Sequence, residues 1–258
     1  MNWLRCITRL ILSAVAILLV SCIDGREEYW VGANGAGRVE IIYHLPTSIA
    51  MLYGGEAGIR ESVTTFLKDT HAFTSAACEV VTEGDLTRVR VRAHFDSALD
   101  LMEVTRDGSI KKLPPAAGHM AGDIKTFISG RTVDFTRKVS AGKALPGGTL
   151  LPDSAFDGKH LVYIIHLPSS VIESNATRTE DGGHTLVWDF PLSQALKTNL
   201  VTHFEMTIPI PWALAFATGI VLLSVAGLTF FLARWARKRN RVKKADSTCD
   251  PIVSESDG

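Results

Sequence analysis

The stretch LTRVRVRAHF, residues 86–95, carries the clearest strand pattern in the chain. From Val89 onward every second residue is apolar, and each residue in between is an arginine or a histidine. Because successive side chains of a strand point to opposite faces, this period of two predicts a strand with one buried face and one polar face. A strand that faces water on one side is typical of an antiparallel sheet.

The residues before this strand predict a helix and further strands. Residues 56–70 place apolar side chains at helical spacing, so we expect an amphipathic helix that packs on the sheet. Residues 78–82 predict a neighbouring strand, and Glu83-Gly84-Asp85 predicts the turn that joins it to residues 86–95. Closer to the amino end, Asn34-Gly35 separates two apolar runs and predicts a β-hairpin over residues 27–46.

The residues after it predict more strands, joined by turns and loops. Residues 124–128 and 133–139 favour a second hairpin, and residues 160–168 and 185–192 favour single strands. The stretch 106–122 is rich in Gly, Pro and Lys and has no period, so we expect a long loop there.

In total we expect eight or nine strands and two or three helices. The strands follow one another in hairpins more than in βαβ units. This organisation predicts an α+β fold: a mostly antiparallel β-sheet with two or three covering helices, plus one C-terminal transmembrane helix.

That transmembrane helix is predicted at residues 212–232, which read WALAFATGIVLLSVAGLTFFL and contain no charged side chain. At about 1.5 Å per residue, a helix of this length spans about 31 Å, which matches a hydrocarbon core of about 30 Å. Seven Arg and Lys residues follow within residues 233–244. Such a cluster stays in the cytoplasm, so we expect residues 233–258 to be a basic cytoplasmic tail.

The amino end combines Arg5 and Arg9 with an apolar run at residues 10–20, a length typical of a signal peptide. The residues LVSC at 19–22 resemble the bacterial lipobox. The resemblance implies a lipoprotein signal peptide at residues 1–21 and lipidation of Cys22. The alternative is an ordinary signal peptide in which the cysteine is incidental.

These ends leave residues 22–211 as one extracytoplasmic domain. A compact domain of this size is about 40 Å across, so we expect both anchors to enter the cytoplasmic (inner) membrane. The hypothesis is that the domain is held at both ends, with one face toward the outer leaflet and the carboxyl end of the chain in the cytoplasm.

Charge and cysteine usage narrow the function further. Residues 23–211 hold 18 basic and 23 acidic side chains, and this mildly acidic balance argues against a nucleic-acid partner. Of the four cysteines only Cys78 lies in the domain, so no internal disulfide is expected. We interpret Cys78 as a small buried apolar residue, with a free thiol or an intermolecular link as the alternative.

Enzyme motifs are missing from the sequence. It contains no HExxH, GxSxG or GK[ST] phosphate loop, and no cysteine and histidine spacing typical of a metal site. We therefore expect a protein that is not an enzyme, with no catalytic residues, no metal and no cofactor. His44 and His166 precede Leu-Pro in two similar stretches, and we interpret them as strand-end histidines rather than as a ligand pair.

Arg88, Arg90 and Arg92 share one face of the predicted strand and stand about 7 Å apart. Three guanidinium groups in a row repel one another unless other charges compensate them. One interpretation is compensation by cross-strand carboxylates such as Glu79. The other is a ligand-binding site for an anionic lipid headgroup, because guanidinium groups bind phosphate in a bidentate way.

A family resemblance adds to these observations. LVSC at 19–22, NGAGRVEIIYHLP at 34–46, SNATRTEDGGHTLVWDF at 174–190 and the single helix with a basic tail resemble the LppM-type lipoprotein domain family. The resemblance implies a β-rich α+β domain associated with envelope lipid or glycolipid. Only Cys22 carries over as a functional position.

Two functions follow as expectations. The first is a non-enzymatic domain that binds membrane lipid or glycolipid, which predicts an apolar groove between sheet and helices, gated by the loop at 106–122. The second is an envelope scaffold or interaction protein that docks another membrane or periplasmic protein. This second function predicts a filled core and an exposed apolar patch.

We predict that replacing Arg88, Arg90 and Arg92 together by Glu abolishes lipid co-purification, because the reversed charges repel an anionic headgroup. Mass spectrometry of the lipid extracted from the purified full-length protein measures the effect. Unchanged lipid content in a folded variant would count against the headgroup site.

Overall fold

The computed structural model describes residues 24–106, 110, 113, 115–145 and 152–209. The chain divides into two units between Pro209 and Ile210. Every element described below belongs to the first unit.

The predicted anchors fall elsewhere in the chain. Outside the described residues lie the signal peptide at 1–21, Cys22, the transmembrane helix at 212–232 and the tail at 233–258. Within the described part, no helix combines the length and the apolar character that crossing a bilayer requires. The anchors therefore stay predictions from the sequence.

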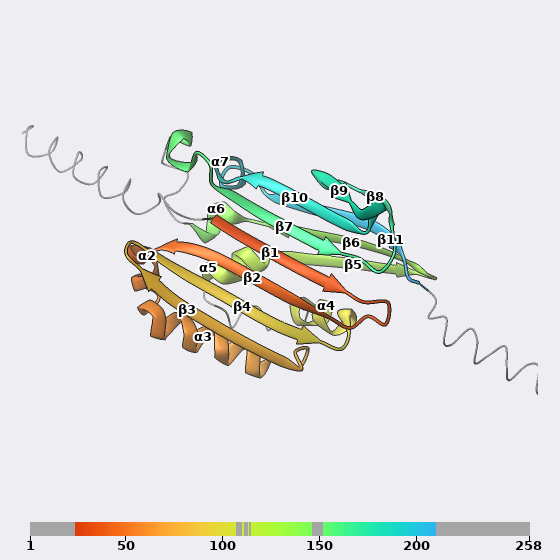
Figure 1. Cartoon of the computed structure of the whole chain (residues 1–258), viewed down its shortest axis with the longest axis horizontal. Coiled ribbons are helices and arrows are strands. Elements are labelled where there is room, and N and C mark those ends of the chain that lie inside the picture. The colour runs from red at the N-terminus through yellow and green to blue at the C-terminus, as the bar shows by residue number, and fades with distance from the viewer. Residues whose placement is uncertain (1–23, 107–109, 111–112, 114, 146–151, 210–258) are drawn as a thin grey trace, which may run out of the picture. The chain divides into compact units, whose positions relative to one another are not determined.

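Seven strands form one mixed sheet, the large sheet (Figure 1). Across it the strands are β3 (Ser75–Glu83), β4 (Leu86–Phe95), β2 (Gly37–Pro46), β1 (Asp24–Val31), β7 (His160–His166), β10 (Thr185–Pro191) and β9 (Arg178–Glu180). Neighbouring strands are antiparallel except β1 and β7, which are parallel. β1 thus joins the amino-terminal hairpins to strands from much later in the chain.

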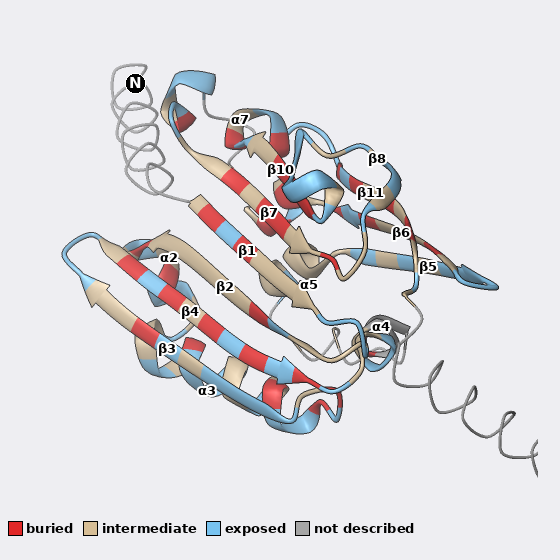
Figure 2. Ribbon diagram, turned by 45° about the vertical axis from the view of Figure 1, so that its right-hand side comes forward, coloured by how far each residue is buried: buried red, intermediate tan, exposed pale blue. Residues whose placement is uncertain are grey.

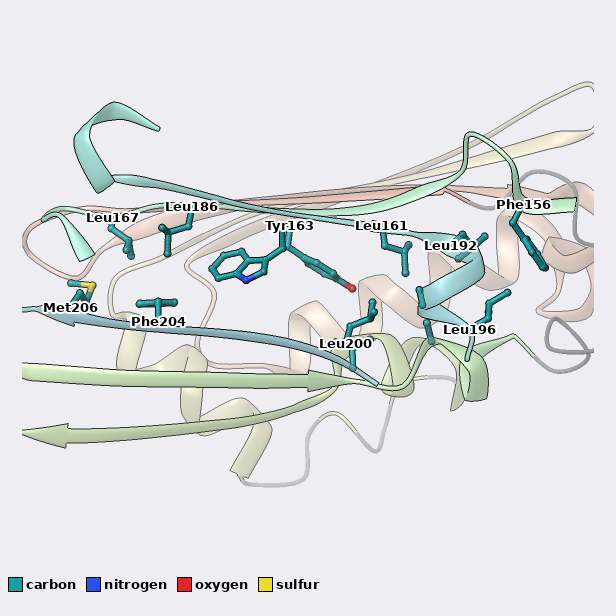
Figure 3. Close-up of a cluster of buried hydrophobic side chains, with 14 of the residues drawn as sticks. Phe156, Leu161, Tyr163, Leu167, Leu186, Leu192, Leu196, Leu200, Phe204 and Met206 are labelled. Carbon is teal, nitrogen blue, oxygen red and sulfur yellow. The ribbon is translucent and has the colours of Figure 1, made fainter. Parts of the chain in front are cut away.

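Four strands form a second, antiparallel sheet, the small sheet. Its order is β5 (Asp123–Ser129), β6 (Thr132–Val139), β11 (Leu200–Thr207) and β8 (Val171–Ser174). It packs on the inner face of the large sheet over β7 and β10, as Figure 3 shows from the side.

Helices cover the rest of that inner face (Figure 1). The described α-helices are α2 (Thr47–Leu52), α3 (Gly55–Asp69), α4 (Ala98–Arg106), α5 (Pro115–Ala121), α6 (Ala141–Ala144) and α7 (Leu192–Ala195). Two short 3₁₀ turns, η3 (Asp153–Phe156) and η4 (Asp181–Gly183), lie in the connections between strands. α3 packs on β3 and β4 through Ile59 and Leu67, which meet Val80 and Val89. α4 contacts β5 and α5 contacts β6, so both lie beside the small sheet.

The burial of β4 confirms the pattern that predicted it. Val89, Val91, Ala93 and Phe95 are buried, and the arginines and histidine between them are exposed or half-buried (Figure 2). The two amino-terminal hairpins, the 56–70 helix and the β5–β6 hairpin are likewise confirmed.

Four expectations about the fold are wrong in detail. The α+β class holds, but the described strands number eleven and form two sheets rather than one, and the described α-helices number six rather than two or three. β8 and β9 have four and three residues, too few to show a period of two in the sequence. The expected loop at 106–122 contains α5, whose sequence PAAGHMA begins with a proline at a position that helices accept.

The largest core lies between the two sheets (Figure 3). Trp188 on β10 is 1% exposed, and its ring lies 6.5 Å from the ring of Phe204 on β11. The indole N–H donates a 2.7 Å hydrogen bond to Oδ1 of Asn175. Trp188 therefore joins the sheets through apolar contact and also satisfies its polar atom.

We predict that Trp188→Ala lowers the free energy of unfolding by about 3–5 kcal/mol, because it leaves a cavity between the sheets. Urea unfolding of the full-length protein at fixed detergent concentration measures this. Trp30→Ala, on the opposite face of the large sheet, is the control and should cost less. Equal losses for the two variants would contradict this assignment of the core.

Candidate functional site

A cavity of about 570 Å³ lies between the inner face of the large sheet and helices α3, α4 and α5. Its wall is made mostly of aliphatic and aromatic side chains. The strand side comes from β1, β2 and β4, whose inward residues alternate with the outward ones. The apolar face that the period of two predicted for β4 thus forms part of the cavity wall.

The helical wall comes from α3, α4 and α5. α3 contributes Ile59, Val63 and Phe66, which share a face because they lie three or four residues apart. α5 contributes Ala116 and Ala117, whose small side chains leave room inside the fold.

Gly122 closes the α5 segment and allows it to pass directly into β5. Its φ of +77° is a conformation that residues with a side chain rarely adopt. A Cβ at this position would lie only 2.6 Å from the backbone oxygen of Lys138. Close packing of α5 against β6 therefore depends on glycine here.

Two charged side chains line the cavity among the described residues, Glu27 on β1 and Arg137 on β6. They are 3% and 6% exposed. Nη1 of Arg137 donates to Oε2 of Glu27 at 2.7 Å, and Nη2 donates to Oε1 at 3.2 Å. The bidentate pair connects the large sheet to the small one.

Further hydrogen bonds complete this cluster. The Tyr29 hydroxyl donates to Glu27 at 2.7 Å, and the Tyr43 hydroxyl donates to the other carboxylate oxygen at 2.5 Å. Arg137 also donates to the backbone oxygens of Ala121 and Met120, at 2.9 and 2.8 Å. Both charges are therefore compensated inside the protein.

The pKa values follow from this geometry. Burial by itself would raise the pKa of Glu27, but the charge of Arg137 and the hydrogen bonds from Arg137, Tyr43 and Tyr29 lower it below the ordinary value. Burial and the Glu27 charge raise the pKa of Tyr29 and Tyr43 well above that of an ordinary tyrosine. At neutral pH Glu27 is ionised and both tyrosines are neutral.

Neither Glu27 nor Arg137 was singled out from the sequence. For Arg137 a signal exists, because it occupies an inward position of β6 where Val133, Phe135 and Val139 are apolar. A charge inside an apolar alternation indicates a buried partner. The sequence does not show which carboxylate that partner is, since Glu27 lies 110 positions away.

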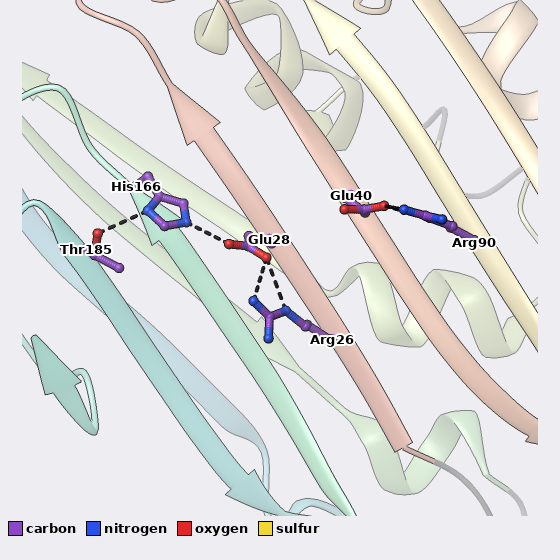
Figure 4. Close-up of polar contacts among 6 residues, drawn as sticks. All are labelled: Arg26, Glu28, Glu40, Arg90, His166 and Thr185. Carbon is purple, nitrogen blue, oxygen red and sulfur yellow. Dashed lines mark hydrogen bonds and ion pairs between the residues drawn. The ribbon is translucent and has the colours of Figure 1, made fainter. Parts of the chain in front are cut away.

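The arginines singled out from the sequence lie on the other face of the large sheet. Arg90 donates to Oε1 of Glu40 at 2.6 Å, and Arg88 lies 3.7 Å from Glu79 (Figure 4 shows the Arg90 pair). No described residue forms an ion pair with Arg92, which is exposed. Cross-strand carboxylates thus compensate two of the three arginines. The headgroup-binding role of Arg88, Arg90 and Arg92 stays a prediction.

The two histidines of the repeated stretches are far apart. His44 pairs in register with Asp24 at the start of β1, whereas His166 pairs with Trp30 near its end. Six residues of strand separate these positions, or about 20 Å. A joint ligand site is therefore excluded, in agreement with the strand-end interpretation.

His166 instead belongs to a polar network on the outer face (Figure 4). Its Nε2 lies 2.8 Å from Glu28, and its Nδ1 lies 3.0 Å from the Thr185 hydroxyl. Arg26 donates to Glu28 at 2.7 Å. These contacts hold neighbouring strands together and leave the cavity side untouched.

The described residues contain no group of three or more His, Cys, Asp or Glu side chains that could hold a metal ion. Cys78 is half-buried, and burial raises the pKa of its thiol. Its side chain lies against the core formed by α3 and the large sheet.

We predict that Glu27→Gln lowers the free energy of unfolding by about 3–5 kcal/mol, because it leaves the buried Arg137 charge without a partner. Glu27→Leu combined with Arg137→Met removes both charges and should cost less than the sum of the single changes.

Since the folded-state pKa of Glu27 is lowered, the stability from this pair is present at neutral pH. It is lost as the pH falls through that pKa. Urea unfolding across acidic pH tests this, and an additive double variant would refute the coupling.

Comparison with known proteins gives a fold neighbour at low similarity. The NMR structure of the folded domain of LppM from Mycobacterium tuberculosis matches with a TM-score of 0.45 and 11% sequence identity, over 73% of this chain and 91% of that one. No protein-family model matches the chain, and no curated protein matches it significantly. A similarity at this level carries no assignment of function.

Proposed function

We propose that this protein is a membrane-anchored envelope lipoprotein whose extracytoplasmic domain binds lipid or glycolipid without catalysis. The observation that carries the proposal is the apolar cavity between the large sheet and helices α3, α4 and α5. Its volume of about 570 Å³ falls in the range of about 300–1,000 Å³ that is typical of small-molecule sites.

The lining favours an acyl chain as the occupant. Each methylene that leaves water for such a wall gains about 0.8 kcal/mol, so a long chain gains enough to stay bound. The charged groups of the wall are confined to the Glu27–Arg137 pair, and outside that cluster Tyr53 and Ser62 are its polar side chains among the described residues.

The paired state of these two charges supports binding rather than catalysis. Glu27 accepts four hydrogen bonds from protein groups, and Arg137 donates to Glu27 and to two backbone oxygens. A general acid or base needs a proton that it can exchange with a substrate. Both groups are already committed to protein partners.

The alternative proposal is an envelope interaction protein that docks a membrane or periplasmic partner. It is favoured by the edge strand β5, where Phe127 is 69% exposed and Ile128 is 42% exposed. Exposed apolar side chains on an edge strand are typical of contact surfaces. The cavity has no part in this second function.

We predict that Ala117→Phe reduces the lipid that co-purifies with the full-length protein at least about fivefold, because the added ring occupies cavity volume. Mass spectrometry of the extracted lipid, normalised to protein, measures this. Ala77→Phe is the matched control, since Ala77 is exposed on the face of the large sheet that points away from the cavity.

Both variants should keep the unfolding midpoint of the parent protein, because the cavity of about 570 Å³ has room for the ring of Ala117→Phe and the ring of Ala77→Phe points to solvent. An Ala117→Phe variant that folds and retains its lipid would refute the binding proposal. The interaction proposal would then become the better one.

A further inference from the structure

We infer that the cavity selects an uncharged hydroxylated amphiphile, such as a long-chain alcohol or a monoacylglycerol, over a fatty acid of the same chain length. This inference rests on the proposed lipid binding and names the chemical class of the ligand. It comes from the juxtaposition of Glu27, Arg137, Tyr29 and Tyr43 at one part of a mostly apolar wall.

The first step is the charge of the wall. Among the described residues that line the cavity, Glu27 and Arg137 are the charged ones, and they neutralise each other at 2.7 Å. An ionised carboxylate inside this wall would bring an uncompensated negative charge into an apolar site. Burying an unpaired charge is far more costly than burying a neutral polar group.

The second step is the availability of Arg137. Four of the five N–H groups of a guanidinium are accounted for by its bonds to Glu27, Ala121 and Met120. Its guanidinium carbon also lies 4.9 Å from the centre of the Tyr163 ring. A fatty-acid carboxylate would have to displace Glu27 to obtain the bidentate contact that stabilises such a pair.

The third step is what the cluster can still accept. Tyr29 and Tyr43 donate their hydroxyl protons to Glu27. The Tyr163 hydroxyl lies beside that of Tyr43, so the oxygen of Tyr29 is the one that retains a lone pair for a further hydrogen bond. A ligand hydroxyl is a donor and meets this requirement, whereas an ionised carboxylate has only acceptors.

The test uses two photoactivatable probes that differ only at the head, hexadecanol and hexadecanoate with a diazirine at the same carbon. The full-length protein in detergent receives equal amounts of both at about pH 9, where a carboxylic acid is ionised. Mass spectrometry then counts adducts on the cavity-lining peptides of α3 and α5. We expect about tenfold more adduct from the alcohol, or about 1.4 kcal/mol of selectivity.

Equal labelling, or a preference for the acid, would overturn the inference while leaving lipid binding intact. If neither probe labels these peptides, the lipid-binding proposal fails, and the inference fails with it. The two failures are therefore distinguishable in one experiment.

Glu27→Gln supplies a variant with the opposite expectation. It frees the charge of Arg137, so labelling should shift toward the acid and invert the preference. The control is Glu27→Leu with Arg137→Met, which removes both charges and should keep the preference for the alcohol. Should Glu27→Gln fold and still prefer the alcohol as strongly as the parent protein, the charge balance does not set the selectivity. Should it fail to fold, the double variant decides, since a preference for the acid there overturns the inference.

Discussion

The ion pair between Glu27 and Arg137 is the interaction on which the arrangement of this domain depends. It joins the middle strand of the large sheet to the small sheet, and Arg137 also binds the backbone at the end of α5. Two sheets and a helix are thus fixed relative to one another by one guanidinium group. Because a buried charge is tolerated only with its partner in place, these elements have to assemble together.

The cavity follows from how the inner face of the large sheet is covered. Large side chains from both sheets, such as Trp188 of β10 and Phe204 of β11, fill the space between β10 and the small sheet, whereas α3 covers β3 and β4. Over β1 and β2 the cover is α4 and α5, and α5 presents alanines. The ion pair lies where the filled core gives way to the cavity, so the only charges in the described lining stand where β1 faces β6.

The two faces of the large sheet use charge in opposite ways. On the outer face, pairs such as Glu40 with Arg90 are partly exposed, so each contributes little to stability and salt weakens it. On the inner face one pair is buried and ties distant parts of the chain together. Arg88, Arg90 and Arg92, which were singled out from the sequence, therefore lie on the solvated face. Arg137, one of the two charged residues in the described lining of the cavity, was not singled out from the sequence.

The sequence by itself determined the local elements. Alternation in residues 86–95, Asn-Gly at 34–35 and the apolar spacing of residues 56–70 each predicted an element that the structure contains, because these signals lie within a few neighbouring residues. Only the tertiary structure decided the parallel pairing of β1 with β7, the separate small sheet and the contact of Glu27 with Arg137. Those features depend on which distant segments pack together. The hydrophobic period of one strand predicts which of its faces is buried, but it does not predict which segment packs on that face.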